Sequence, residues 1–323
     1  MEMKTIVLIG GCGFLGSHLA EFFQKENKVI ILGNFKRNSI RFLKDQKNIE
    51  LHNVDLLNDN AFSILENYIK YSDVVLNLAA IAGVSNYSKY PVNVLLTNGL
   101  GTAKVLDVCK KFDKRLIIFS SSEVYGEGSS NCFEEQYVIL DSPKNLRLSY
   151  AVSKLFGDHL AYSYYKQFGL PITIVRPFGI YGPRQLGEGG IQIFVRKCIN
   201  NETLQVVGNG VQTRDWCYVE DLVEAINLIL TNDKSIGEIY NIGNPDTNCT
   251  ILQLAKLIKE LTKSSSEIEF IERSGVKDTM FRKCNVNKAG SSLIWYPKTS
   301  LKDGLLKTIE WYRENNVGEN ISV

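Results

Sequence analysis

Apolar runs alternate with helix-like segments along the first half of the chain. The segment 14–26 is predicted to be helical, and 92–111 carries apolar residues at helical spacing. The short runs between them are apolar throughout, a pattern typical of parallel strands that are covered on both faces. We expect strands at 5–9, 29–32, 49–54, 74–78 and 116–119. Repeated strand–helix–strand units predict an α/β fold with a doubly wound parallel sheet.

The second half of the chain has a different texture. A helix at 149–168 and a strand at 172–175 precede a long loop at 177–190 that is rich in glycine and proline. Short helices and strands alternate after this loop, up to a final helix at 301–315. We expect a sheet domain at 1–178 and a smaller α/β lobe at 179–323, with 211–243 returning to the sheet domain. Ligands would bind between them, at the carboxyl ends of the strands.

The composition narrows the class of protein. Of the 323 residues, 44% are hydrophobic and 22% are charged, which is ordinary for a globular protein. The net charge of +2 gives no reason to expect a nucleic acid or a membrane surface as partner. We expect no secretion signal and no membrane span, because no apolar run reaches about eighteen residues. Seven cysteines without CxxC or Cys/His spacing predict reduced thiols, no metal site and a cytoplasmic location.

A glycine-rich turn joins the first predicted strand to the first helix. Gly10 permits the tight turn, Gly13 lets the backbone approach a pyrophosphate, and Gly16 allows the helix to pack closely on the strand. The amino terminus of the helix favours the negative charge of a phosphate. In this context the three glycines predict a Rossmann domain that binds a dinucleotide.

The end of the second predicted strand leaves the choice between NAD and NADP open. A carboxylate there would bind the adenosine ribose of NAD, but the strand ends in Gly33 and Asn34 and is followed by Lys36 and Arg37. The two cations would tolerate a 2′-phosphate and so favour NADP, unless they form a solvated loop face. Asp55, just after the third strand, would either hydrogen-bond the adenine or cap the next helix.

Tyr150 and Lys154 lie four residues apart on a predicted helix and therefore share one of its faces. The charges of the lysine and of a nearby nicotinamide would stabilise a phenolate, so we expect a lowered pKa and an acid–base role for Tyr150. Upstream, the strand at 116–119 is followed by Ser121, at a strand end where a substrate hydroxyl or carbonyl would lie.

With these residues the chain resembles the extended short-chain dehydrogenase/reductase superfamily, in its branch of nucleotide-sugar epimerases, dehydratases and decarboxylases. The resemblance runs nearly from end to end, and its motifs are specific to the superfamily rather than to one substrate. The motifs are the glycine loop, NLAA at 77–80, Asn98 before GT at 101–102, Ser121, Tyr150, Lys154, RPF at 176–178, YGPR at 181–184, TRD at 213–215, WYP at 295–297 and LKDGL at 301–305.

The resemblance implies roles for individual residues. Ser121 would polarise the reacting oxygen, Tyr150 would take or give its proton, and Lys154 would hold the ribose and tune the phenol. The residues that would contact the cofactor are Gly10, Gly13, Phe14, Leu15, Gly16, Asn34, Lys36, Arg37, Asp55, Leu56, Ala79, Ala80, Asn98, Tyr150 and Lys154.

Glu123 is the variable residue that says most about the reaction. The segment SSEVYG at 121–126 resembles the TSEVYG of UDP-glucuronate decarboxylases, whereas 4,6-dehydratases carry TDE there and simple 4-epimerases usually lack the acid. Ser122 in place of aspartate argues against a 4,6-dehydratase, whose elimination needs an extra acid. After oxidation at C4 a uronate would readily lose carbon dioxide, in a site where Ser122 and Glu123 are candidate catalytic residues. Alternatively, Glu123 only orders its neighbours.

The substrate is expected to contact arginines of the second lobe, because arginine binds a diphosphate in bidentate fashion. By resemblance these are Arg184, Arg214 in the region that binds the nucleotide phosphate, and Arg282 at a position that contacts phosphate or sugar carboxylate in the decarboxylases. Each would otherwise be a surface arginine. Gly179 stands where relatives carry an asparagine that touches the sugar diphosphate, and Asn77 where many carry histidine.

Several functions stay open at this point. The first is an NAD- or NADP-dependent epimerase or decarboxylase that transiently oxidises C4 of a nucleotide-diphosphate hexose or hexuronate and recycles its cofactor. The second, an NADPH-dependent 4-ketosugar reductase, would consume its cofactor. The third is a dinucleotide sensor without catalysis. Relatives of that kind commonly lose the tyrosine–lysine pair, which this chain keeps as Tyr150 and Lys154. The helices at 92–111 and 149–168 match those that form a four-helix bundle between subunits in relatives, which predicts a homodimer.

Overall fold

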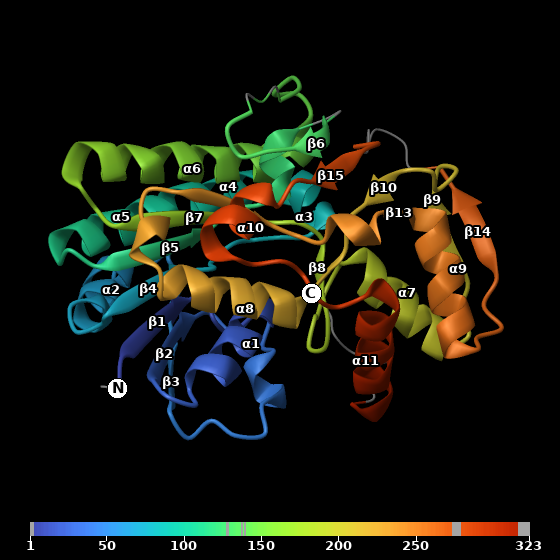
Figure 1. Ribbon diagram of the computed structural model, residues 1–323, viewed down its shortest axis with the longest axis horizontal. Coiled ribbons are helices and arrows are strands. Elements are labelled where there is room, and N and C mark those ends of the chain that lie inside the picture. The colour runs from blue at the N-terminus through green and yellow to red at the C-terminus, as the bar shows by residue number, and fades with distance from the viewer. Residues whose placement is uncertain (1–2, 127–128, 137, 139, 273–278, 316–323) are drawn as a thin grey trace.

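A parallel sheet of seven strands lies at the centre of the fold (Figure 1). The structure is a computed structural model that describes residues 3–126, 129–136, 138, 140–272 and 279–315. The strand order is β12-β7-β5-β4-β1-β2-β3, and each neighbouring pair is parallel. The strands are β1 (Thr5–Ile9), β2 (Lys28–Gly33), β3 (Ile49–Asn53), β4 (Val74–Asn77), β5 (Arg115–Phe119), β7 (Ile172–Pro177) and β12 (Ile239–Ile242). The predicted doubly wound parallel sheet is confirmed.

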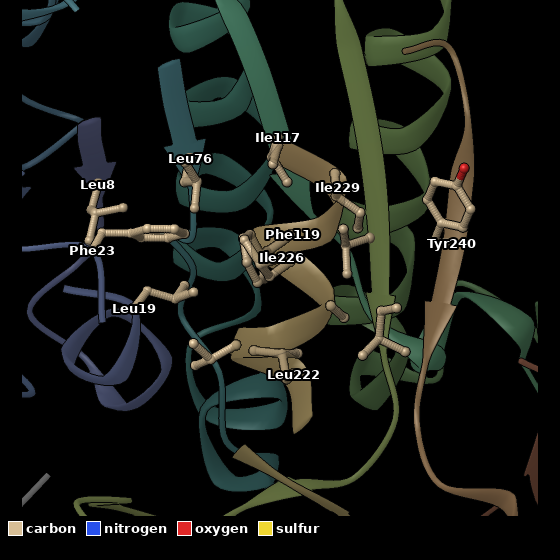
Figure 2. Close-up of a cluster of buried hydrophobic side chains, with 14 of the residues drawn as sticks. Leu8, Leu19, Phe23, Leu76, Ile117, Phe119, Leu222, Ile226, Ile229 and Tyr240 are labelled. Carbon is tan, nitrogen blue, oxygen red and sulfur yellow. The ribbon is translucent and has the colours of Figure 1, made fainter. Parts of the chain in front are cut away.

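Helices cover both faces of this sheet, because successive strand side chains point to opposite sides. On one face Leu8, Leu76 and Ile117 of the sheet meet Phe23 and Ile226 of the helix layer (Figure 2). Burial of each such side chain contributes roughly 1.5–3 kcal/mol to folding. This face carries α1 (Phe14–Phe23), α8 (Val219–Leu230) and α10 (Asn287–Leu293), and the other carries α2 (Ala61–Ile69), α5 (Gly101–Lys111) and α6 (Ser149–Phe168).

The second lobe lies at one end of the sheet and has a core of its own (Figure 1). Its elements are α7 (Gly190–Ile199), β9 (Leu204–Val207), α9 (Ile251–Thr262), β14 (Ile268–Ile271) and α11 (Leu301–Glu314). Between α7 and α9 the chain returns to the first lobe to supply α8 and the edge strand β12. The later helix α10 also packs beside α8, a return that the sequence pattern did not indicate.

Short elements connect the two lobes around the strand ends. The extended ones are β6 (Ser129–Cys132), β8 (Ile180–Tyr181), β10 (Thr213–Arg214), β11 (Cys217–Tyr218), β13 (Cys249–Thr250) and β15 (Arg282–Cys284). The helical ones are α3 (Val84–Lys89), α4 (Pro91–Leu95), a π-helical turn (Leu96–Leu100) and five 3₁₀ turns (Ile40–Phe42, Ser122–Tyr125, Leu146–Leu148, Asp233–Ser235 and Pro245–Thr247).

The helix predicted at 92–111 is thus a composite of α4, the π-helical turn and α5. Such turns are rare and frequently occur at functional sites, and this one carries Asn98. Among the described residues, none of the helices combines the length and the apolar character that crossing a membrane requires.

Gly16 is required by close packing, and Gly13 is not. A Cβ at Gly16 would lie 2.2 Å from the carbonyl oxygen of Gly11, whereas a Cβ at Gly13 would meet its nearest atom at 3.7 Å. We therefore expect Gly16→Ala to lower the free energy of unfolding by about 1–3 kcal/mol, because backbone must move. Gly13→Ala should change it by less than about 1 kcal/mol and instead weaken NAD binding. Urea unfolding and calorimetric titration with NAD measure both effects; equal stability of the two variants would contradict the assignment.

Candidate active site

The turn between β1 and α1 forms an open cradle for an anion. Gly10 has a φ of +76°, and a Cβ on it would lie 2.5 Å from the Cα of Ala79, so the ends of β1 and β4 touch there. Gly13 precedes α1, and within the described residues neither a side-chain cap nor an acidic residue occupies the first turn of that helix. Unopposed amide groups at a helix amino terminus suit a pyrophosphate. The residues present therefore fit a bound dinucleotide.

The end of β2 carries no carboxylate, but Asp55, which follows β3, lies beside it. The Oδ2 atom of Asp55 lies 3.4 Å from Asn34 Nδ2 and 3.8 Å from Lys36 Nζ. Arg37 turns away from this group and donates to the carbonyl oxygen of Ala82 at 2.7 Å. A 2′-phosphate would meet the Asp55 carboxylate and only one of the two cations. This geometry favours NAD, although the charge pattern of the sequence favours NADP.

The loop after β4 is held against the catalytic helix by Asn98. Its Oδ1 accepts from the backbone of Ile81 at 2.8 Å, and its Nδ2 donates to Ser153 Oγ of α6 at 3.1 Å. Asn77 similarly accepts from the backbone of Ala79 at 3.3 Å. These buried amides fix the backbone beside Ala79 and Ala80. Of the other predicted cofactor residues, Leu56 is buried in the core, and Phe14 and Leu15 begin α1 and pack against the core of the second lobe.

Ser121 and Tyr150 meet as predicted. Ser121 lies two residues after the end of β5. Its Oγ accepts a hydrogen bond from the backbone of Glu123 at 3.2 Å, which caps the turn at Ser122–Tyr125. A side-chain hydrogen bond joins Ser121 to Tyr150. The Tyr150 ring stacks on Tyr87 of α3, with centroids 4.8 Å apart and planes inclined by 14°. Tyr87 was not predicted from the sequence.

The protein's own residues raise the pKa of Tyr150 on balance, whereas the expected lowering also counted the charge of a bound nicotinamide. Burial raises the pKa of Tyr150 to about 12; the hydrogen bond from Ser121 lowers it, the Glu123 carboxylate raises it and the Arg37 charge lowers it. Lys154 is not among these influences, because its Nζ donates to the carbonyl oxygen of Phe119 at 2.7 Å and lies 5.9 Å from the centroid of the Tyr150 ring. Burial lowers the pKa of Lys154 to about 8, and Asp158 raises it.

Glu123 is held between two buried arginines. Its Oε1 accepts from Arg282 NH1 at 2.7 Å, and its Oε2 lies 3.7 Å from Arg147 NH1. Burial raises the pKa of Glu123, but Arg282 and then Arg147 lower it, which leaves it at about 2. The carboxylate is therefore ionised at neutral pH. Ser122 is buried at the start of the same turn.

Arg282 and Arg147 reach Glu123 from different parts of the chain. Arg282 lies on β15, which pairs with β6. Arg147, another residue that was not predicted, lies in the turn directly before α6. The sequence signal for Arg147 is its position three residues before Tyr150. This spacing does not predict where the side chain points, because the sequence does not indicate the geometry of the short turn.

The remaining substrate candidates lie apart from one another. Arg184 is buried and donates to Glu21 Oε2 of α1 at 2.7 Å, so its charge is already paired; it fastens the loop after β8 to the first lobe. Arg214 donates to the carbonyl oxygen of Thr213 at 2.7 Å, and its charge also lowers the pKa of Glu123.

Gly179 departs from the pattern of relatives for a steric reason. It has a φ of +49°, and a Cβ there would lie 2.0 Å from the carbonyl oxygen of Asp215. An asparagine therefore cannot occupy this backbone without displacing it. Asp215 is itself fixed, because its Oδ1 accepts from Asn248 Nδ2 at 2.6 Å.

Fold and site together define a dinucleotide-binding enzyme with a Ser-Tyr-Lys centre. The chain belongs to the NAD dependent epimerase/dehydratase family, whose model matches residues 6–243. This confirms the family predicted from the motifs, its enzymatic character and NAD as the cofactor that the family uses.

Named relatives and solved structures cover nearly the whole chain. UDP-N-acetyl-alpha-D-glucosaminuronate decarboxylase of Bacillus cytotoxicus is 36% identical over 321 residues, which cover 96% of this chain and 98% of that protein. UDP-glucuronic acid decarboxylase 1 of Xenopus tropicalis is 33% identical over 320 residues, with coverage of 97% and 73%. UDP-glucuronic acid 4-epimerase from Bacillus cereus, solved with UDP-glucuronic acid and NAD, superimposes with a TM-score of 0.87 at 29% identity, with coverage of 96% and 99%.

Asp55 should set the preference for NAD. We expect Asp55→Asn to improve NADP binding relative to NAD by about tenfold, because it removes one charge that repels a 2′-phosphate. Calorimetric titration of each dinucleotide into the wild type and the variant measures the ratio. Asp59→Asn, outside this contact, is the matched control. A wild type that binds NADP as tightly as NAD would contradict the assignment.

Proposed function

We propose that the enzyme decarboxylates a UDP-hexuronate through NAD-dependent oxidation at C4. The observation that carries this proposal is the cluster in which Glu123 binds Arg282 and faces Arg147, next to Tyr150. A neutral hexose gives no use for two buried guanidinium groups at this place, whereas a uronate brings a carboxylate that needs them. Relatives that share up to 36% identity over almost the whole chain are named as decarboxylases of such uronates.

In the first step Ser121 would hydrogen-bond the C4 oxygen while Tyr150 takes its proton. NAD supplies the acceptor of the hydride from C4 and returns it at the end of the cycle. The phenol must ionise to act as a base, and burial opposes this by raising its pKa to about 12. The positive charge of the oxidised nicotinamide would lower that pKa in the complex.

In the second step the uronate is a β-keto acid and loses its carboxyl group. The C5–C6 bond would break, carbon dioxide would leave, and the electron pair would form an enolate that takes a proton from water at C5. Arg282 and Arg147 would orient the departing carboxylate and then stabilise the enolate charge. Glu123 is ionised and paired with Arg282, so it would keep the guanidinium groups in place and weaken their hold on the carboxylate before it departs.

In the last step Tyr150 would return its proton to the C4 oxygen as the ketone is reduced. The net products are a UDP-pentose and carbon dioxide, and the cofactor is unchanged. Arg214 of β10 would bind the diphosphate. Six of the seven cysteines are buried, and reduced thiols there would be compatible with a reducing, cytoplasmic location.

A panel of UDP-sugars tests the reaction. We expect UDP-glucuronate or UDP-N-acetylglucosaminuronate to lose one carbon dioxide, detected by mass spectrometry, with no net consumption of NAD. Tyr150→Phe should lower kcat by a factor of about 10²–10⁴, while the matched control Tyr90→Phe, at an exposed tyrosine, should retain activity.

The same assay separates the chemical steps and the competing reactions. Arg282→Met should still form NADH in a single turnover but release carbon dioxide more slowly. An isomer of unchanged mass would identify a 4-epimerase instead, and stoichiometric consumption of NADPH a 4-ketosugar reductase. Failure of every nucleotide sugar to react in the presence of NAD would remove the proposal.

We also propose that two copies associate through α4, the π-helical turn and α6. These segments pack side by side and leave several apolar side chains in solvent. Exposed apolar side chains that gather on neighbouring helices are usually covered by a partner. The exposed residues are Val92, Leu95, Leu96, Leu100, Val152 and Phe156.

A charge in this apolar surface should separate the copies. We expect Leu100→Glu combined with Phe156→Glu to give a monomer in sedimentation velocity, where the wild type sediments as a dimer. Ile294→Glu is the matched control, since Ile294 is 86% exposed at the end of α10 and lies outside the surface. A monomeric wild type would contradict the proposed assembly.

A further inference from the structure

A buried carboxylate, Asp158, lies one helical turn after Lys154 on α6. Asp158 follows Lys154 by four residues on α6, as Lys154 follows Tyr150, so the three side chains share one helix face. Asp158 is only 3% exposed. None of the steps above uses it, and a buried carboxylate is costly unless cations or hydrogen-bond donors compensate it.

The compensating cation is Arg176 of β7. Its Nε donates to Asp158 Oδ2 at 2.9 Å, and Arg176 is itself 6% exposed. Its NH1 group donates to the hydroxyl of Tyr125 at 3.0 Å and to the carbonyl oxygen of Glu134 at 3.1 Å. The ion pair therefore connects α6 with the turn that carries Glu123 and with the segment after β6.

The network continues to the strand that carries Arg282. The Tyr125 hydroxyl donates to Asn241 Oδ1 of β12 at 2.7 Å. The Nδ2 of Asn241 then donates to the carbonyl oxygens of Cys132 at 3.0 Å and of Asn285 at 3.3 Å. Cys132 ends β6, and Asn285 directly follows β15. One chain of hydrogen bonds thus connects α6, the Ser122–Tyr125 turn and β15, which carry Lys154, Glu123 and Arg282.

We propose that Asp158 and Arg176 are positioning residues of the active site: Asp158 keeps the buried Lys154 ammonium charged, and Arg176 fixes the Ser122–Tyr125 turn and the β6–β15 pair relative to it. Lys154, Asp158 and Arg176 together carry a charge of +1. Loss of the carboxylate raises this to +2 in a buried site, and loss of the arginine lowers it to zero. The low local dielectric makes both changes costly.

The groups that face Lys154 support this assignment. On its own helix Asp158 raises the pKa of Lys154 against the effect of burial, and the Tyr150 ring lies 5.9 Å away. From β5 it meets the uncharged carbonyl of Phe119. Arg176 of β7 contacts Asp158, and the neutral Tyr125 of the Ser122–Tyr125 turn contacts Arg176. Both groups are therefore linked to Lys154 by way of Asp158. Burial raises the pKa of Asp158, an effect that the charges of Arg176 and Lys154 oppose.

The test is a double-mutant cycle read against pH. Asp158→Asn, Arg176→Met and the double variant are compared with Glu21→Gln, which removes the carboxylate partner of another buried arginine, Arg184, away from Lys154. The first measurement is kcat as a function of pH. The second is the pH dependence of the urea midpoint, which needs no substrate and so keeps its meaning if the proposed reaction is wrong.

The sign of the second measurement follows from Lys154. Its pKa is lowered from 10.5 to about 8 on folding, so the folded state carries the cost of a buried ammonium below about pH 8. That cost disappears as the pH rises from about 8 to 10.5, and the contribution of Lys154 to stability increases over this window. Without Asp158 the increase should begin at lower pH.

We expect Asp158→Asn to shift both pH profiles downward by about one unit from the Lys154 pKa of about 8. The shift lowers kcat about twofold at pH 7 and by up to about tenfold well above pH 8, and kcat recovers at lower pH. KM should change little. The double variant regains the charge of +1, so its pH profile should return toward the wild type while kcat stays low. Asp158→Glu retains the charge and should retain the pH profile even if its kcat falls.

Three results would overturn the proposal. One is an Asp158→Asn variant that loses activity equally at every pH. Another is a double variant with the pH profile of Asp158→Asn. The third is a Glu21→Gln variant with the same shift, which would show a general response to the loss of the carboxylate partner of a buried arginine. If Asp158→Asn does not fold, a shifted pH profile in Asp158→Glu counts against the proposal in its place.

Discussion

The hydrogen bond from Lys154 to the carbonyl oxygen of Phe119 joins the catalytic helix to the central sheet, and the arrangement of the site depends on it. Phe119 ends β5, which lies between β4 and β7 in the parallel sheet. Because parallel strands end at one edge, the same constraint places Ser121 beside Tyr150 and brings the end of β4 to the glycine turn. The edge of the sheet therefore fixes where Ser121, Tyr150 and the glycine turn lie relative to one another.

The second lobe contributes mainly charge. Arg282 and Arg214 come from short strands of the later chain, and their charges lower the pKa of Glu123 on the first lobe. The two lobes also meet where Arg184 binds Glu21. Both contacts are ion pairs that join distant parts of the sequence, one of them inside the site and the other away from it. These ion pairs join the lobes in addition to the packing of Phe14 and Leu15 against the core of the second lobe.

The parts of the site that follow a local periodicity could be predicted from the sequence. The spacing of Tyr150 and Lys154 places them on one helix face in any helix, and the glycine turn needs only its strand and helix. Tyr87, Arg147 and Arg176 could not be predicted in this way, because their roles come from packing between segments that the sequence does not place side by side. The contact of Arg184 with α1 could not be predicted either, because it also depends on packing between distant segments. The resemblance to the family placed Arg184 at the substrate instead.

The direction of the Tyr150 pKa needed the structure because burial and charge act on it in opposite senses. Charge counting favours a low value, and desolvation in the site outweighs it to give a pKa of about 12. A raised pKa of Tyr150 would be useful in a reaction cycle that reduces the cofactor and then reoxidises it. Tyr150 would hold the proton from the C4 oxygen firmly while the nicotinamide is reduced and neutral, and would lose it readily only beside the positive, oxidised ring. A phenol that was acidic in the protein alone would exchange that proton at the intermediate stage and would leave the C4 ketone without its donor.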